Sequence, residues 1–401
     1  MKPTLLFYCQ HSVGMGHLTR SFALAQALVR DWRVVFLNGG PFPPGLHAPA
    51  GVEIIDLPPL GMVDGHNLVS RDARFNVAEA MALRRERMLA ALAETDPRII
   101  LIELFPFGRK KFAFELLPLL KAARRRARPP LVISSLRDIL INTRPDKQHH
   151  DDRARWLADR YFDAVLVHAD PRFARLEESF RPGRALAVPV FYTGFALPQR
   201  AAAGPVARGD HVLVSAGGGM AGIPLFRAAL AAHDLLWPRE GLAMRLVAGP
   251  FLPEDDWREL VRAGEGREGF ELVRAVPDMH AEMRRAALSV SQCGYNTALD
   301  IVASGVPALV VPFAEGREDE QMNRARRLEA LRLLRMLPPI LLDGWRLAQE
   351  IQAALGFSPE PAGLELDGAA KTASIVGELL AASSRPAPRM ASIAGQRAVE
   401  A

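Results

Sequence analysis

The sequence predicts an α/β protein made of two Rossmann-like domains whose parallel sheets face each other across a cleft. Two observations carry this prediction: short apolar runs alternate with segments of helical periodicity, and the alternation stops once, near residue 200, before it starts again. Most of the apolar runs lack alternating polar residues, which is typical of strands covered by helices on both faces.

The N-terminal domain is predicted over residues 1–195. It opens with an apolar run from Leu5 to Cys9, a turn-rich segment, and apolar residues at helical spacing from Leu18 to Val29. These three segments predict a strand, a loop and a helix. Strands that alternate with helices in this way form a parallel sheet. A second helix is predicted over residues 77–93, and further strands over residues 34–37, 99–102, 131–134 and 164–167.

A segment rich in Ala, Gly, Pro and Arg, residues 196–210, is predicted to link the two domains. The C-terminal domain is predicted over residues 211–382. Its last helix, predicted over residues 369–382, either ends this domain or crosses back to the first. Residues 383–401 are expected to form a flexible tail. Strands of this domain are predicted over residues 212–216, 245–248, 270–273, 288–291 and 308–311.

The composition of the 401-residue chain is that of a globular protein, with 49% hydrophobic and 24% charged residues. Two cysteines, Cys9 and Cys293, exclude a disulfide framework and favour a reducing, cytoplasmic setting. The formal net charge of +5 is too small an excess to indicate a nucleic-acid partner. No apolar run reaches the roughly 18 residues of a membrane-spanning helix, and the first run is too short for a signal peptide.

The first loop, between the first predicted strand and helix, carries Gly14, Gly16 and His17. Glycines let a ligand approach the backbone, and the helix N-terminus offers unpaired N–H groups and a partial positive charge. An imidazole at this position would act as the general base on an attacking hydroxyl or water. The alternative is a tight turn with a capping histidine. The loop is not a dinucleotide fingerprint, because Thr19 stands where the third glycine belongs.

A second glycine-rich loop follows the first strand of the C-terminal domain and contains Ser215, Gly217, Gly218 and Gly219. Three consecutive residues without side chains would let a diphosphate lie on backbone N–H groups. The loop lacks the Gly-Lys-Ser/Thr ending of an ATPase phosphate loop, so it predicts no Walker-type ATP hydrolysis. The alternative is a flexible turn that binds no ligand.

A third segment follows the strand predicted over residues 288–291. Gly294 precedes a predicted helix whose first N–H groups would face phosphate, and Asp300, one turn into that helix, would accept hydrogen bonds from ribose hydroxyls. Glu320 and Gln321 form a polar pair on the next loop and are suited to the hydroxyls of a sugar. The segment therefore predicts a nucleotide-sugar site.

The order of these motifs resembles the GT-B glycosyltransferases, and within them the branch of MurG-like N-acetylglucosamine transferases. In that family the loop ending in Gly-His lies in the acceptor-side domain, and His17 ends the corresponding loop here. The family's nucleotide-binding core, Gly-x-x-Thr-x-x-x-acid, is matched by Gly294, Thr297 and Asp300. The resemblance covers most of the chain, in two blocks, and implies a GT-B fold.

The resemblance also implies a reaction: the inverting, metal-independent transfer of a sugar, N-acetylglucosamine or similar, from UDP to an acceptor hydroxyl. His17 would be the catalytic base, and no cofactor is implied beyond the UDP-sugar donor. A lipid-linked acceptor would bring the protein into peripheral contact with the inner face of the membrane. By the same resemblance, the uracil would lie against Val276, the phosphates against Gly218, Asn296 and Thr297, the ribose on Asp300, and the donor sugar on Glu320 and Gln321.

Three positions depart from the family pattern. Asp300 stands where the family usually has glutamate, a shorter side chain that still suits two ribose hydroxyls. The family's Pro-Val-Arg after the domain junction, whose arginine faces the diphosphate, is replaced by residues 194–196, Gly-Phe-Ala. Arg324 follows Asn323 where the family has alanine.

The first loop also resembles the Gly-His-x-x-Arg loop of the UDP-sugar hydrolase of the pseudaminic acid pathway, in which the histidine activates water. Gly16, His17 and Arg20 match that loop, and Arg20 is expected to belong to the acceptor-side loop. Transfer, hydrolysis and binding without catalysis therefore all remain open, and the full second domain favours transfer.

Residues 105–128 mix aromatic and basic side chains, as do residues 84–87 to a lesser degree. The stretch would rest on an anionic bilayer, or it is an ordinary half-buried helix with a solvated basic face. No metal site is expected. Residues 149–152, His-His-Asp-Asp, are of ligand type, but adjacent residues on a helix diverge around its axis.

Overall fold

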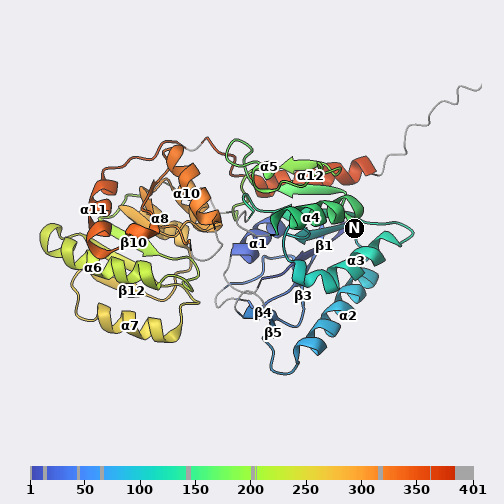
Figure 1. Ribbon diagram of the computed structural model, residues 1–401, viewed down its shortest axis with the longest axis horizontal. Coiled ribbons are helices and arrows are strands. Elements are labelled where there is room, and N and C mark those ends of the chain that lie inside the picture. The colour runs from blue at the N-terminus through green and yellow to red at the C-terminus, as the bar shows by residue number, and fades with distance from the viewer. Residues whose placement is uncertain are drawn as a thin grey trace, which may run out of the picture.

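The computed structural model describes residues 2–11, 16–42, 46–63, 67–140, 146–199, 204, 206–314, 319–361 and 363–383. Gly14, most of the first glycine loop and the predicted tail after residue 383 lie outside the described residues. The described chain forms two α/β lobes that lie side by side (Figure 1).

The N-terminal lobe is built on a seven-stranded sheet in the order β3-β2-β1-β6-β7-β8-β9. All pairings in this sheet are parallel. A separate antiparallel hairpin, β4 and β5, lies between β3 and α2 in the chain. The elements are β1 (Thr4–Cys9), α1 (Gly16–Leu28), β2 (Arg33–Asn38), β3 (Val52–Asp56), β4 (Leu60–Val63), β5 (Asn67–Ser70), α2 (Val77–Thr95), β6 (Ile99–Glu103), η1 (Lys110–Phe112), α3 (Ala113–Arg124), β7 (Leu131–Leu136), α4 (Lys147–Tyr161), β8 (Ala164–Val167), α5 (Leu176–Ser179) and β9 (Val190–Tyr192).

The C-terminal lobe is built on a six-stranded parallel sheet in the order β12-β11-β10-β13-β14-β15. Its elements are β10 (His211–Ser215), α6 (Ile223–Glu240), β11 (Ala243–Val247), α7 (Glu254–Gly264), β12 (Phe270–Val273), α8 (Met279–Arg285), β13 (Leu288–Ser291), α9 (Tyr295–Ser304), β14 (Ala308–Val310), α10 (Glu320–Ala330), β15 (Arg335–Met336), η2 (Pro339–Leu341) and α11 (Gly344–Leu355). The helix α12 (Gly368–Ser383) follows them in the chain. The prediction of an α/β chain with two Rossmann-like halves is confirmed.

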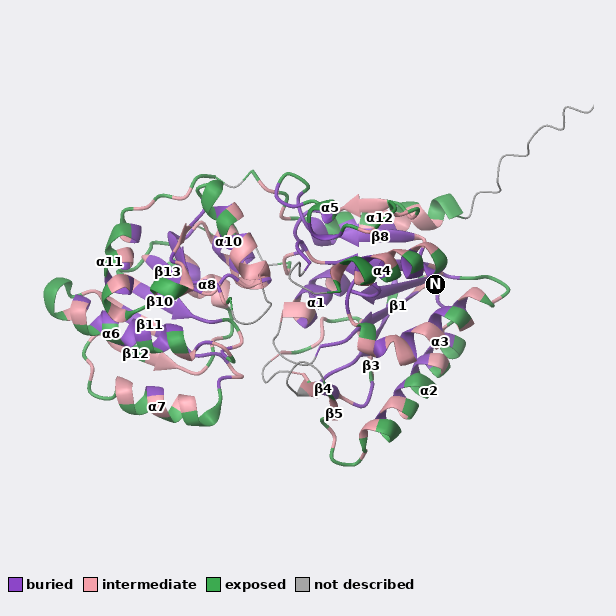
Figure 2. Cartoon of the chain, in the orientation of Figure 1, coloured by how far each residue is buried: buried purple, intermediate pink, exposed green. Residues whose placement is uncertain are grey.

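The central strands are buried along their whole length because helices cover both faces of each sheet. Leu5 to Cys9 of β1 and Ile99 to Glu103 of β6 are almost completely inaccessible to solvent. Figure 2 shows the same pattern, with buried strands inside and exposed faces on the outer helices. The runs of apolar residues without alternation in the sequence have this origin.

In each sheet the strand order reverses beside the first strand of the lobe. Strands β2 and β6 flank β1, and β11 and β13 flank β10, so β1 and β10 lie at topological switch points. Ligands of open α/β sheets bind in the crevice outside the carboxyl ends of the strands at such a point. The loops that follow β1 and β10 are the first and second glycine-rich loops of the sequence.

The last helix, α12, returns to the N-terminal lobe. Ala369 and Val376 pack in the same core cluster as Leu24 of α1. The returning chain is held at the junction by hydrogen bonds from Phe195 N to Glu365 O (2.7 Å) and from Gly368 N to Phe195 O (3.0 Å). By its packing, α12 therefore lies with the N-terminal lobe, although the prediction over residues 211–382 grouped it with the second domain.

The basic and aromatic stretch over residues 105–128 does not present its rings to solvent. Phe105, Phe107 and Phe112 are at most 2% exposed and pack in the core, while the cation of Lys110 is 55% exposed. Arg84 is likewise fully buried. The half-buried helix with a solvated basic face is thus the alternative that the structure supports. Among the described helices, none is both long and apolar enough to cross a bilayer.

Candidate functional site

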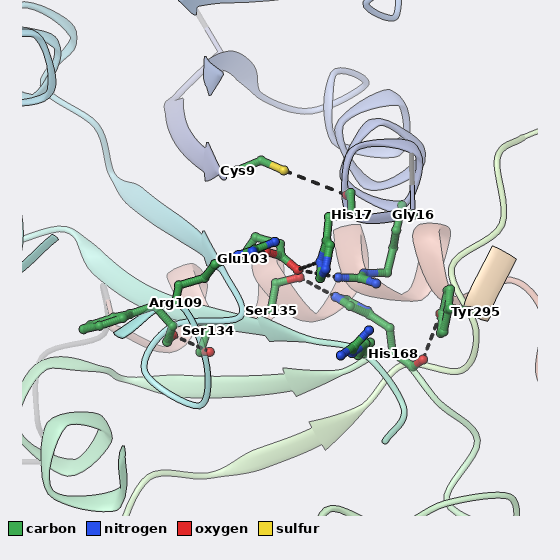
Figure 3. Close-up of polar contacts among 12 residues, drawn as sticks. Cys9, Gly16, His17, Glu103, Arg109, Ser134, Ser135, His168 and Tyr295 are labelled. Atoms are coloured by element: carbon green, nitrogen blue, oxygen red, sulfur yellow. Dashed lines mark hydrogen bonds and ion pairs between the residues drawn. The ribbon is translucent and has the colours of Figure 1, made fainter. Parts of the chain in front are cut away.

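His17 lies in the first turn of α1 and forms a pair with Glu103, the last residue of β6. The distance between His17 Nδ1 and Glu103 Oε1 is 2.6 Å (Figure 3). Glu103 is completely buried, whereas the His17 side chain remains 19% exposed. Strands β1 and β6 are neighbours in the sheet, so the helix that follows β1 begins beside the carboxyl end of β6. The parallel topology therefore brings the two residues together from 86 positions apart in the chain.

Glu103 is the residue that the sequence analysis missed. Two further cations surround it: Arg20 Nη2 lies 2.6 Å from Oε1, and Arg109 Nε lies 3.6 Å from Oε2. One sequence feature could have identified Glu103 as a candidate site residue. It directly follows the apolar run Ile99–Ile102, which forms a strand next to β1. An acidic residue at the carboxyl end of a central parallel strand is a candidate site residue on topology alone.

Electrostatics hold the imidazole neutral and the carboxylate charged. Burial lowers the pKa of His17 to about 3, against the opposing effect of the Glu103 carboxylate. Burial by itself raises the pKa of Glu103, but His17, Arg109 and Arg20 together hold it well below its ordinary value. An ionised carboxylate only accepts hydrogen bonds, so Nδ1 of His17 carries the proton. The lone pair of His17 is then on Nε2, where it is available as a proton acceptor.

A second buried chain of hydrogen bonds runs beside this pair and reaches the other lobe. Ser135 Oγ lies 2.7 Å from His168 Nε2, and His168 Nδ1 lies 2.9 Å from Thr193 Oγ1. Tyr295, the first residue of α9, donates its hydroxyl to the backbone oxygen of His168 at 3.0 Å (Figure 3). Burial lowers the pKa of His168 to about 3, so this imidazole is also neutral. Tyr295 of the C-terminal lobe thus contacts the residue that directly follows β8 of the N-terminal lobe.

The second glycine-rich loop, between β10 and α6, needs glycine for close packing. Gly219 has a φ of +91°, and a Cβ there would lie 2.2 Å from the backbone oxygen of Ala248. Phe251 N donates to Gly218 O at 2.8 Å, so the loop rests on the segment after β11. Gly217 is exposed, has a φ of +57°, and faces Thr297, whose Oγ1 would lie 3.7 Å from a Cβ at Gly217. The structure therefore brings the second and third motifs together, with Ser215 buried at the end of β10.

In the described part of the chain, no side chain caps the N-terminus of α9, which lies next to the N-terminus of α1. Gly294 is its N-cap and supplies no side-chain hydrogen bond. The first N–H groups of a helix have no partner within the helix and carry a partial positive charge. Asn296 Nδ2 donates to the backbone oxygen of Gly16 at 3.5 Å across the two lobes. The helix that would hold phosphate thus faces the helix that holds His17, and Asp300 lies half-buried one turn further along α9.

Three predicted donor contacts have other partners in the structure. Gln321 Oε1 accepts hydrogen bonds from Cys293 N (3.0 Å) and Phe313 N (3.2 Å). It therefore connects the segment before α9 with the segment after β14. Glu320 forms an ion pair with Arg137 of the N-terminal lobe, with Arg137 Nη1 2.9 Å from Oε1. Val276 is partly buried against the core cluster that includes Tyr295. A sugar contact for Glu320 would require this ion pair to open.

Arg20 does not lie open to an acceptor. Its side chain is 2% exposed, and its guanidinium binds Glu103 and lies 5.2 Å from the ring centroid of Tyr295. Arg20 therefore holds the carboxylate that holds His17, and its assignment to the acceptor-side loop remains a prediction. Its side chain points inward because residue 20 is one turn further along α1 on the face that packs onto the sheet.

Arg324, a departure from the family pattern, holds the two lobes together. It is 2% exposed and donates from Nε (2.7 Å) and Nη2 (2.9 Å) to the carboxylate of Asp138 in the N-terminal lobe. Burial by itself raises the pKa of Asp138, but Arg324 holds it below its ordinary value. Tyr295 also lies under this cation, 5.8 Å from its ring centroid to the guanidinium carbon. No local sequence pattern marks this pair, because Asp138 and Arg324 are 186 residues apart in the chain.

Two other groups singled out in the sequence take no part in the site. Burial raises the pKa of the Cys293 thiol to about 12, which leaves it unreactive as a nucleophile. Asp151 accepts hydrogen bonds from Lys147 Nζ (2.5 Å) and Arg181 N (2.8 Å), so it ties α4 to the chain after α5. In the described part of the chain, no group of three or more His, Cys, Asp and Glu side chains is placed to hold a metal ion.

Comparison with known proteins agrees with this geometry. Residues 240–371 match the family described as the glycosyltransferase family 28 C-terminal domain. This segment includes α9 and Gln321, both predicted to contact the donor. The chain is 30% identical over 176 residues to the UDP-N-acetylglucosamine–N-acetylmuramyl-(pentapeptide) pyrophosphoryl-undecaprenol N-acetylglucosamine transferase of Brucella anthropi, an alignment that covers 43% of this chain and 45% of the relative. The chain thus spans about half the length of the curated relatives it matches.

Solved structures match over nearly the whole chain. The calicheamicin glycosyltransferase CalG4 superposes with a TM-score of 0.60 at 18% identity, covering 96% of this chain and all of that one. MurG of Acinetobacter baumannii superposes with a TM-score of 0.54 at 14% identity, covering 94% of this chain and all of that one. At these identities the likeness establishes the fold. The chain therefore has a GT-B fold, its residues 240–371 match the glycosyltransferase family 28 C-terminal domain, and it resembles the MurG-like transferases.

Proposed function

We propose that this protein is an inverting, metal-independent glycosyltransferase that moves a sugar, N-acetylglucosamine or similar, from a UDP-sugar to an acceptor hydroxyl. The observation that carries the proposal is the placement of His17, held by Glu103, opposite the uncapped N-terminus of α9. A proton acceptor in the N-terminal lobe then faces a site for a leaving diphosphate in the C-terminal lobe. Each of the two lies at the topological switch point of its own sheet.

The proposed reaction uses the neutral imidazole. His17 Nε2 takes the proton of the acceptor hydroxyl while the hydroxyl oxygen bonds to the anomeric carbon. The bond from that carbon to the diphosphate oxygen breaks on the opposite face, so the configuration inverts and UDP leaves. Glu103 stabilises the imidazolium that forms, and the N–H groups at the start of α9 and in the Gly217–Gly219 loop stabilise the charge on UDP. The developing negative charge is then met by backbone groups rather than by a metal ion.

The comparisons support the donor half of this proposal most directly. The family match lies in the half of the chain that carries α9 and Asp300, and the names of the curated relatives describe UDP-N-acetylglucosamine transferases. The relatives' names describe a lipid-linked acceptor, and we extend this to the present chain only as a candidate. Such an acceptor would place the protein at the inner face of the membrane.

Hydrolysis of a UDP-sugar is a second candidate, and the position of Arg20 favours it. His17 and Arg20 bind the same oxygen of Glu103, so the Gly-His-x-x-Arg segment forms one unit around a single carboxylate. The same unit would activate a water molecule that occupied the position of the acceptor hydroxyl. Release of UDP from a UDP-sugar without any acceptor would establish hydrolysis.

Ligand binding tests the donor site before any acceptor is known. UDP and UDP-N-acetylglucosamine should raise the melting temperature of the wild-type protein, because a ligand at 100 times its dissociation constant adds about 2.7 kcal/mol. Asp300→Ala should abolish that shift, and Asp255→Ala, on the remote helix α7, should retain it. If another nucleotide stabilises the protein and uridine nucleotides do not, the donor is different. If no nucleotide does, or if Asp300→Ala keeps the full shift, the donor-site assignment is wrong.

A further inference from the structure

Tyr295 is the first residue of α9, but its hydroxyl bonds to the other lobe. The hydroxyl donates to the backbone oxygen of His168 at 3.0 Å (Figure 3), and it accepts a hydrogen bond from Ala196 N at 3.3 Å. His168 directly follows β8, and Ala196 packs in a core cluster of the N-terminal lobe. Burial raises the pKa of the Tyr295 phenol, so the hydroxyl stays protonated and remains a donor. The helix whose start would face the diphosphate is therefore attached to the N-terminal lobe at its first residue.

Two buried guanidinium groups lie over the Tyr295 ring. The Cζ atoms of Arg20 and Arg324 are 5.2 Å and 5.8 Å from the ring centroid, and each arginine side chain is 2% exposed. A cation at such a distance from an aromatic face is attracted by the ring, and more strongly where water is excluded. Each guanidinium also binds a carboxylate of the N-terminal lobe, Arg20 that of Glu103 and Arg324 that of Asp138. The ring thus limits where both cations can lie.

Arg20 connects the Tyr295 ring to the proposed base. Its Nη2 lies 2.6 Å from Glu103 Oε1, and the same oxygen lies 2.6 Å from His17 Nδ1. One guanidinium and one carboxylate therefore separate Tyr295 from the imidazole. Because Glu103 orients the imidazole through this hydrogen bond, a displacement of Arg20 would also displace the base.

Packing alone does not explain the contacts of Tyr295. A phenylalanine would occupy the same place in the core cluster, yet the hydroxyl has two hydrogen bonds to backbone atoms. Tyr192 provides a comparison within the protein. It packs against the same core cluster, but its hydroxyl accepts a hydrogen bond from Leu176 N at 2.8 Å within its own lobe. Tyr295 differs because its hydrogen bonds cross from one lobe to the other.

We propose that Tyr295 is a positioning residue that sets the distance between the start of α9 and His17. Its hydroxyl holds the start of α9 against the N-terminal lobe, and its ring holds Arg20 against Glu103. In the proposed reaction the imidazole and the leaving diphosphate act on opposite faces of one anomeric carbon, so their relative placement decides the rate. Tyr295 itself touches neither substrate. The inference goes beyond the groups that bind or react, and it rests on the proposed function.

Kinetics of matched tyrosine variants test this role. Turnover of UDP-N-acetylglucosamine would be measured in wild type, Tyr295→Phe, Tyr295→Leu and Tyr192→Phe, each with calorimetry of UDP binding and a melting curve. Since a misplacement of about 1 Å costs about 10²-fold in rate, kcat should fall about tenfold without the hydroxyl in Tyr295→Phe and about 100-fold in Tyr295→Leu. The dissociation constant of UDP should stay within about twofold of wild type, because backbone groups hold the donor. Tyr192→Phe removes a hydroxyl that bonds to backbone within one lobe, and it should keep the wild-type kcat.

A second readout does not depend on turnover. The Nδ1 proton of His17 lies in the hydrogen bond to Glu103, and its NMR resonance can be assigned by its loss in His17→Ala. Its exchange with solvent should be about tenfold faster in Tyr295→Leu, where Arg20 loses the ring. The exchange rate should stay within about twofold of wild type in Tyr295→Phe and in Tyr192→Phe, because both variants keep an aromatic ring at position 295. A tyrosine that only fills the core would not change this rate.

Three outcomes would overturn the assignment. A lower melting temperature of the Tyr295 variants with unchanged kcat and unchanged proton exchange would make Tyr295 a packing residue. A large loss of UDP affinity in Tyr295→Phe with unchanged kcat would place the tyrosine in the donor site. An unchanged exchange rate in Tyr295→Leu would show that the ring does not hold Arg20 on Glu103.

The two readouts also separate this inference from the proposed function. If the wild type neither binds UDP nor turns over UDP-N-acetylglucosamine, the proposed function fails by itself, and the exchange of the His17 proton still tests Tyr295. If Tyr295→Leu does not fold, the kinetics of Tyr295→Phe decide.

Discussion

The two halves of the site are built from different materials. The N-terminal side is formed by ionisable side chains, because His17, Arg20 and Arg109 converge on the buried Glu103. The C-terminal side is formed by backbone N–H groups, which belong to the glycine loop after β10 and to the start of α9, where Gly294 supplies no side-chain cap. Backbone N–H groups suit any diphosphate, whereas a cluster of charged side chains can be specific for one acceptor. Under the proposed function, the contrast predicts that acceptor specificity is set in the N-terminal lobe.

The largest effect should follow from removing the proton acceptor. His17→Ala should lower kcat by about 10²–10⁴-fold, the range typical of a general base. UDP affinity should stay within about twofold of wild type, because the donor lies on backbone groups of the other lobe. Steady-state kinetics and calorimetry with UDP would check the two halves separately. Wild-type turnover in this variant would show that His17 is not the base.

A smaller effect is expected where side chains join the lobes. Asp138→Asn leaves the cation of Arg324 buried without its carboxylate, so it should lower the free energy of unfolding by about 3–5 kcal/mol. The matched control is the double variant Asp138→Leu with Arg324→Met, which removes both charges and should recover most of the loss. Denaturant unfolding would measure both. An equal loss in the double variant would mean that packing, and not the unpaired charge, causes the effect.

On the backbone side, Gly219→Ala should cost about 1–3 kcal/mol of stability, since the added carbon would meet the Ala248 carbonyl. Gly241→Ala is the control for φ alone, because Gly241 also has a positive φ, +61°, and nothing lies within 4 Å of the added carbon. It should cost less than Gly219→Ala, and UDP affinity should fall only in Gly219→Ala. Similar losses for both would show that the contact with Ala248 does not matter.

The smallest effect concerns the pH dependence of the rate. His17 must be neutral to accept a proton, and burial lowers its pKa to about 3, so its protonation should not slow the reaction as the pH falls from 8 to 5. In the unfolded chain a histidine binds a proton near pH 6.5, so the free energy of unfolding should decline below that pH. Initial rates measured with a parallel melting curve separate the two effects. A rate that falls with an apparent pKa near 6.5 would contradict a buried, neutral His17.

The same contrast explains what could be predicted from the sequence. The strands, the second glycine-rich loop and the helix from residue 295 leave local signals, such as Gly217 to Gly219 after an apolar run, and these predictions agree with the structure. Glu103, Asp138 and Arg109 acquire their roles only when distant strands become neighbours, so no local pattern marked them. The aromatic residues over 105–128 show the converse case, because composition alone did not reveal that the rings face the core.

Charge pairing explains why some predicted contacts differ. Glu320 was expected on the donor sugar, yet in the folded chain it meets Arg137 of the other lobe, a residue without any motif. Arg20 was assigned to the acceptor-side loop, and in the folded chain the helical period turns its guanidinium onto Glu103 of the same lobe. Both outcomes depend on which ionisable groups the fold brings together. This information is not contained in residue spacing.

The central claim is that His17 and Glu103 act as one unit, and a double-mutant cycle tests it most directly. Turnover of UDP-N-acetylglucosamine would be measured in wild type, His17→Ala, Glu103→Gln and the double variant, each with a melting curve. If Glu103 acts only through His17, Glu103→Gln should lower kcat in the wild-type background and have no further effect once His17 is absent. Two losses that multiply in the double variant would show that the residues act independently and would contradict the account.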